Sequence, residues 1–190
     1  FLIQIYIVAS LFIDVLSTVR ELLFSDSKLW LAINCATLNF YSISEIILIA
    51  LFISNVIPKK NINKIIKTLC CIYVTFCVSL WLYFPTAITS DLHYLFALEG
   101  IFITIFCLFY FYEIIHTGFS IDISQDSNFI AICGILFYFS TSVPYYFSSY
   151  KLLELSPDSF IIYDCINYFF YTILFLSFIK AYLCPVLLQK

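Results

Sequence analysis

From Ser127 to Tyr150 the chain reads SNFIAICGILFYFSTSVPYYFSSY, a stretch without one charged side chain. A hydrocarbon core about 30 Å thick is crossed by about 20 apolar residues in a helix, so this stretch is long enough to span a bilayer. A second charge-free stretch lies between Lys67 and Asp91. Because these apolar runs are continuous and do not alternate with period two, they predict helices and exclude the strands of a membrane β-barrel.

The composition extends this interpretation to the whole chain of 190 residues. Hydrophobic residues make up 63% and charged residues only 11%, and the mean hydropathy is +1.03. A soluble domain keeps about a quarter of its residues charged, which excludes a water-soluble fold. The net charge of −3 argues against nucleic-acid binding, which needs a dense basic face.

Short stretches of polar and charged residues divide the chain into six apolar segments. The prediction is an all-α, polytopic bundle that forms a single transmembrane helical domain over 1–190. Its spans are placed at about 1–24, 29–57, 65–84, 92–117, 127–150 and 159–183. No loop is long enough for a soluble catalytic or ligand-binding domain, so we expect the function to lie in the membrane or in a partner protein.

Lysine placement predicts the orientation. Lys59, Lys60, Lys64 and Lys67 cluster around the second connection, whereas the third connection has no basic residue. By the positive-inside rule, the second connection and the C-terminus are cytoplasmic. The expected location is the cytoplasmic (inner) membrane of a bacterium.

Five of the carboxylates inside the predicted spans are singled out as intramembrane groups: Asp14, Glu45, Glu99, Glu113 and Asp164. Each costs at least about 2.5–3.5 kcal/mol near a helix centre on the insertion scale, so lipid does not tolerate them on an outer face. At helical spacing, other polar residues share the helix face of each carboxylate. Four of the six helices carry such a face, and we expect these faces to turn toward a common polar centre. The candidate ligand-binding or ion-route residues are Asp14, Tyr41, Glu45, Glu99, Tyr110, Glu113, Asp164 and Asn167.

Three interpretations of this polar centre stay open. The groups can be protonated or hydrogen-bonded and hold the bundle in register, they can line a pocket that binds or senses a polar ligand, or they can form a proton or cation route.

No catalytic motif is present. Tyr163-Asp164 lacks the Gly-x-Gly-Asp partner of aspartyl intramembrane proteases, and neither Gly-x-Ser-Gly nor His-Glu-x-x-His occurs. His93 and His116 lie on one predicted helix about 34 Å apart, too far to share a metal or haem. The eight cysteines form no CxxC pair and are expected to be small buried hydrophobes. The sequence predicts no enzymatic activity, no cofactor and no metal.

The small residues and the aromatic residues support two further predictions, one about close helix contacts and one about the membrane interface. None of the three glycines, Gly100, Gly118 and Gly134, forms a GxxxG motif, so close helix contacts are expected to use Ser, Ala, Thr and Cys. Tyr145 and Tyr146 lie near a predicted helix end, where they suit the aromatic belt of the membrane interface.

Several stretches resemble those of small multi-pass bacterial membrane proteins. They are Asn39-Phe-Tyr-Ser-Ile-Ser-Glu45, Leu98-Glu-Gly100, Phe129 to Phe139, Ile166-Asn-Tyr-Phe169 and Phe178-Ile-Lys180. Those proteins are similar to the seven-helix membrane sensor halves of histidine kinases. The resemblance implies a seventh span before Phe1, an outer N-terminus and, since no kinase module follows Lys190, a separate output protein.

The expected function is therefore non-enzymatic. The preferred hypothesis is a signal-sensing or ligand-binding bundle that acts through a protein partner in the membrane. One alternative is an accessory subunit of a larger membrane complex. The other is a small proton- or cation-coupled transporter that uses the intramembrane carboxylates.

Overall fold

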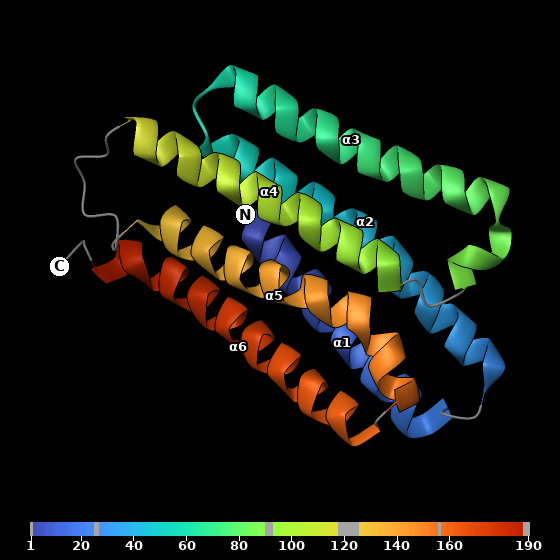
Figure 1. The fold of residues 1–190 in the computed structure, drawn as a ribbon. Helices are drawn as coiled ribbons and strands as arrows, with labels where there is room; N and C mark the ends of the chain where they lie inside the picture. Colours follow the sequence, from blue (N-terminus) through green and yellow to red (C-terminus); the bar gives the residue numbers. More distant parts are fainter. Residues whose placement is uncertain (1, 25–26, 90–92, 118–125, 156, 188–190) are drawn as a thin grey trace.

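The computed structural model describes the chain except residues 1, 25–26, 90–92, 118–125, 156 and 188–190 (Figure 1). The described part consists of helices and their short connections, which confirms the predicted all-α fold. The elements are α1 (Leu2–Phe24), α2 (Lys28–Val56), α3 (Lys60–Tyr83), η1 (Pro85–Thr89), α4 (His93–Thr117), α5 (Ser127–Leu155) and α6 (Pro157–Leu187). Six of them are long and apolar enough to cross a membrane.

Helix boundaries follow local rules of the backbone. A residue that precedes proline avoids the helical region, and Ile57, which precedes Pro58, is extended and caps α2. Lys59 is also extended, and α3 begins at Lys60. This start is earlier than the predicted span start at 65 because a helix can continue beyond the apolar run into the interface, where lysine head groups reach water.

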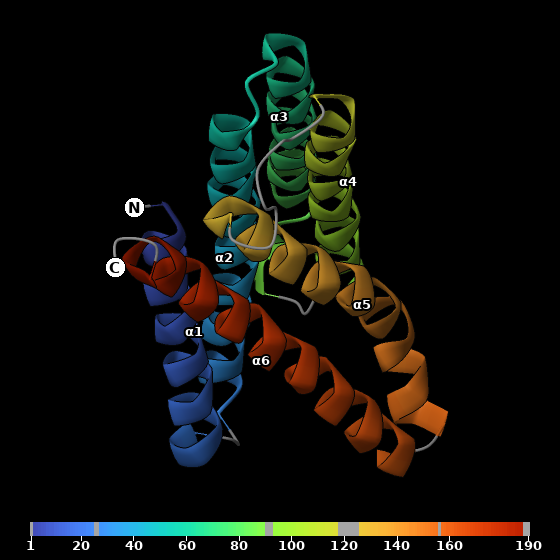
Figure 2. The ribbon, with the colours of Figure 1, turned by 90° about the vertical axis from the view of Figure 1, so that its left-hand side faces the viewer.

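The helices form one bundle with α5 near its middle in the view of Figure 2. There α5 lies between α4 and α6, while α1 runs along α2, and α3 stands at the edge beside α2 and α4. Pro144 lies inside α5, and the α5 ribbon bends in its second half.

Two glycines take part in close helix contacts, in addition to the Ser, Ala, Thr and Cys residues expected there, and one of them faces a serine. A Cβ at Gly134 of α5 would lie 2.6 Å from the Ser177 Cβ of α6. A Cβ at Gly100 of α4 would lie 2.9 Å from Val143 Cγ2 of α5. Glycine can act without a GxxxG pair here because the facing residue supplies the other half of the close contact.

Large apolar side chains cover the outside of the bundle as well as its core. Leu22, Leu82 and Ile115 are each more than 75% exposed. Such residues surround all six helices, which water would penalise and lipid favours. The chain is therefore an integral, multi-pass membrane protein whose solvent is the bilayer.

Candidate functional site

A cavity of about 330 Å³ lies between five of the helices. It occupies the half of the bundle opposite the α2–α3 connection, where α1 and α2 diverge from α5 and α6 in Figure 2. The residues that line it are Ser10, Ile13, Asp14, Ser17, Asn34, Leu38, Tyr41, Glu45, His93, Phe96, Tyr138, Tyr145, Tyr146, Asp164, Asn167, Tyr168 and Tyr171. Among these described lining residues are three carboxylic acids and no Lys or Arg.

Two of the lining carboxylates are oriented by tyrosines. The Tyr171 hydroxyl of α6 donates to Asp14 Oδ2 of α1 at 2.9 Å. The Tyr145 hydroxyl of α5 donates to Asp164 Oδ1 of α6 at 2.8 Å. Within the described part of the chain, the second oxygen of each carboxylate accepts no hydrogen bond. Each carboxylate is thus fixed in place and still has an acceptor to offer to a ligand.

The third lining carboxylate, Glu45, is buried at the inner end of the cavity and only 8% exposed. Its Oε1 accepts a hydrogen bond from Tyr6 at 2.8 Å and has Tyr41 at 3.2 Å. The Tyr41 hydroxyl also lies 3.0 Å from Ser10 Oγ. Because Tyr41 has one proton, it can donate to Glu45 or to Ser10 but not to both at once.

Behind Glu45 lies a second buried carboxyl group, Glu99 of α4, which is 2% exposed. The two carboxyls lie close enough to interact electrostatically. Ser42 donates to Glu99 Oε2 at 2.6 Å, but Oε1 finds no donor among the described residues unless Glu45 carries a proton. Carboxylates only accept hydrogen bonds, so contact between these two groups requires a proton on one of them.

Hydrogen bonds link these groups into a network across the bundle that is interrupted only between Glu45 and Glu99, where no hydrogen bond joins the described side chains. Ser10 joins the Tyr171–Asp14 pair to Tyr41, because its hydroxyl lies 2.7 Å from that of Tyr171. On the far side, Ser42 lies 2.8 Å from the Tyr73 hydroxyl of α3. The network therefore runs sideways, from α6 through α1, α2 and α4 to α3, and not along the helices.

Apolar side chains separate this network from the opposite half of the bundle. Ile103 and Phe106 follow Glu99 on α4, and both are 0% exposed. No hydrogen bond of the described residues connects Glu99 with the polar groups beyond them. Among the described residues, the polar groups connected with the cavity are therefore confined to one half of the bundle.

The structure brings together six of the eight predicted site residues. Asp14, Tyr41, Glu45, Asp164 and Asn167 line the cavity. Glu99 contacts it through Glu45.

Glu113 and Tyr110 lie elsewhere, which corrects their assignment to the polar centre. Glu113 Oε2 lies 3.7 Å from Lys59 Nζ, at the end of the bundle away from the cavity. Tyr110 is 4% exposed, and its hydroxyl has no hydrogen-bond partner in the described chain. Helical spacing placed both on the face of Glu99, but Glu113 is about 21 Å farther along the axis.

The tyrosines of α5 are site residues that the sequence interpretation missed. Tyr138, Tyr145 and Tyr146 line the cavity, although Tyr145 and Tyr146 were expected in the interface belt. Their spacing in the sequence could have indicated a common site, because Tyr138 and Tyr145 are seven residues apart and so share one helix face.

The thiols and histidines form no recognisable centre. All eight cysteines are free, and Cys71 and Cys165 are exposed, contrary to the expected burial, because they face outward on lipid-facing helices. His93 lies at the cavity, stacked on Tyr146 with ring centroids 6.4 Å apart. In the described ranges, no three His, Cys, Asp or Glu residues gather closely enough to hold a metal ion.

Comparisons with protein families, with characterised proteins and with solved structures found no match to this chain.

The chemistry of the cavity follows from its lining. Six tyrosine rings and three carboxyl groups surround it, and these attract positive charge through ring faces and through acceptor oxygens. A volume of about 330 Å³ is at the small end of the range for small-molecule pockets. The arrangement suits a small organic cation that carries hydrogen-bond donors.

Proposed function

We propose that this protein binds a small organic amine in the cavity and reports its presence to a separate protein in the membrane. The observation that carries the proposal is the lining, in which Asp14 and Asp164 lie among tyrosine rings and each have one oxygen that accepts no hydrogen bond from any described residue. An ammonium group would receive charge-assisted hydrogen bonds from these oxygens, and the rings would add cation–π attraction.

The sensing hypothesis fits the connection between the cavity and the helices. A ligand that draws Asp14 toward Asp164 acts on α1 and α6, which are joined by the Tyr171 hydrogen bonds to Asp14 and Ser10. Interhelical hydrogen bonds in membranes contribute only about 0.6 kcal/mol each on average, so a ligand can readily shift this contact. The lysine cluster at the opposite end supports an outward-facing cavity, because basic residues mark the cytoplasmic side.

A transport function is the weaker alternative. A cation route needs polar groups on both sides of the centre, whereas Ile103 and Phe106 fill the interior of α4 beyond Glu99. The sideways course of the hydrogen-bond network also favours coupling between helices over passage along them.

Thermal unfolding of the protein in mild detergent tests the proposal, with tyramine as the probe and 4-hydroxyphenylacetate as a probe of similar shape and opposite charge. We expect tyramine to raise the unfolding temperature in a concentration-dependent way, since a ligand that binds only the folded state stabilises it. The acid should have no effect. Asp14→Asn and Asp164→Asn should each weaken binding about tenfold or more, in line with hydrogen bonds to charged groups.

Glu113→Gln is the matched control because it also removes a carboxylate, but outside the cavity. Equal responses to the amine and the acid, or equal losses in the control and in Asp14→Asn, would contradict the proposal. Tyramine or proton flux through the wild-type protein in proteoliposomes would favour the transporter instead.

A further inference from the structure

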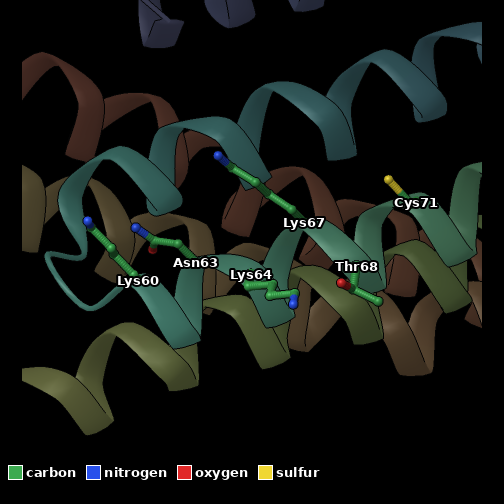
Figure 3. Close-up of a pocket in the computed structure, with 6 residues that line it drawn as sticks. All are labelled: Lys60, Asn63, Lys64, Lys67, Thr68 and Cys71. Atoms are coloured by element: carbon green, nitrogen blue, oxygen red, sulfur yellow. The ribbon is translucent and has the colours of Figure 1, made fainter.

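A second candidate site lies on α3, outside the cavity described above. A pocket of about 490 Å³ is lined there by Lys60, Asn63, Lys64, Lys67, Thr68 and Cys71 (Figure 3). Next to it, an apolar groove of about 390 Å³ lies between α2 and α3 and is lined by Ile47, Ala50, Leu51, Lys67, Cys70, Cys71, Val74 and Thr75. Lys67 and Cys71 belong to both, so the basic pocket continues into the apolar groove.

The charges of this pocket are not neutralised within the described chain. Lys59 contacts Glu113, but Lys60, Lys64 and Lys67 are exposed and form no ion pair with any described residue. Lys60 and Lys64 are four residues apart, a spacing at which like charges repel and lower helix stability. In Figure 3 the side chains of Lys60 and Lys67 extend to the same side of the helix, with Asn63 between them. An anion on this side of the helix would be attracted by the ammonium groups of both Lys60 and Lys67.

The position of the pocket along α3 selects the kind of anion. Lys60 is the first residue of α3, and Lys67 lies about 10 Å farther along the helix axis. This distance spans the transition from head groups to hydrocarbon. The Lys67 side chain reaches back toward Lys60 in Figure 3, as lysines near helix ends do to keep their charge at the interface. The two ammonium groups are therefore expected on one side of the helix near phosphate level, while Val74 and Thr75 continue the groove into the apolar layer.

We infer that this surface binds one anionic phospholipid, with its phosphate between Lys60 and Lys67 and an acyl chain in the groove between α2 and α3. Basic pockets beside transmembrane helices have the charge to hold such head groups. Charge complementarity and an apolar groove that begins at the same lysine together select a lipid over a soluble anion, which would leave the groove unused.

Native mass spectrometry of the protein in mild detergent tests this inference, with dioleoyl-phosphatidylglycerol as the probe and dioleoyl-phosphatidylcholine as the neutral control. We expect preferential binding of one phosphatidylglycerol. The double change of Lys60→Gln and Lys67→Gln should weaken it by about fivefold per lysine, about 25-fold together. The charge-preserving change of both residues to Arg should retain it. Thr75→Trp, which fills the groove and keeps the lysines, should weaken it as well.

The matched control is the double change of Lys28→Gln and Lys151→Gln, which removes two exposed lysines at the other end of the bundle. Equal affinity in this control and in the Lys60/Lys67 variant would overturn the inference, as would equal binding of the two lipids. Displacement of the lipid by millimolar inorganic phosphate, or an unaltered affinity in Thr75→Trp, would overturn the assignment of a lipid as the occupant. Amine binding in the cavity is measured separately, so the two proposals can fail independently.

Discussion

Replacement of Glu45 separates the hydrogen-bonding role of this buried carboxyl from its charge. In Glu45→Gln the amide oxygen can still accept from Tyr6, and the amide NH₂ can donate to Glu99 Oε1, which has no other donor in the described part of the molecule. Every hydrogen bond of the carboxyl pair can therefore form without a shared proton. We expect the free energy of unfolding of Glu45→Gln to equal or exceed that of the wild type.

Glu45→Leu has a similar volume and should behave differently. It removes the acceptor of the Tyr6 hydroxyl, which lies on a residue only 3% exposed. A buried donor without a partner costs about 1–3 kcal/mol, and interhelical hydrogen bonds in membranes contribute about 0.6 kcal/mol each. Glu45→Leu should thus be about 1–3 kcal/mol less stable than Glu45→Gln.

Equilibrium unfolding in mixed micelles with increasing SDS, followed by circular dichroism, measures both variants. Tyr6→Phe in the Glu45→Leu background removes the orphaned hydroxyl and should recover part of the loss. If Glu45→Gln were as unstable as Glu45→Leu, the negative charge and not the hydrogen bonding would hold this position, and the reasoning about the carboxyl pair would be refuted.

Two further predictions concern the packing of the bundle. Gly134→Ala should cost about 1–3 kcal/mol, because its Cβ would lie 2.6 Å from Ser177 Cβ. Adding Ser177→Gly should restore the stability measured by SDS unfolding, whereas Ser177→Ala, which keeps that Cβ, should not; equal rescue by both would contradict the proposed contact. Asn39→Leu should release η1, whose Ile88 and Ala87 carbonyls lie 2.8 and 3.4 Å from Asn39 Nδ2. Hydrogen exchange should then rise at η1 but not in α5, and unaltered protection at η1 would count against this role.

The membrane fold could be predicted from charge-free runs such as 127–150. In a bilayer, such a segment must form a helix, because a helix makes all of its backbone hydrogen bonds internally. Part of the site could be predicted for the same reason, since the carboxylates Asp14, Glu45 and Asp164 had to turn away from lipid. Glu113 was grouped with them because it shares a helix face with Glu99, although it lies about 21 Å farther along the axis and pairs with Lys59.

Tertiary partners account for what the sequence did not predict. Tyr145 is of a residue type that is common at the membrane interface. Its hydroxyl finds an acceptor in Asp164 only because α6 packs beside α5. The role of Gly134 likewise depends on the residue that faces it, Ser177, which is distant in sequence and follows no motif.

The hydrogen bond between Asp14 and Tyr171 also constrains the biogenesis of the protein. Its two residues are 157 positions apart, one in the first helix and one in the last. At about 5–20 residues per second, Asp14 waits about 8–30 s during synthesis before its partner leaves the ribosome. Throughout that interval α1 must be held by the insertion machinery or by its hairpin with α2, with its carboxyl group in water or neutralised. The cavity can thus form only after α6 has been synthesised, and shorter nascent chains lack the residues of α6 that line it.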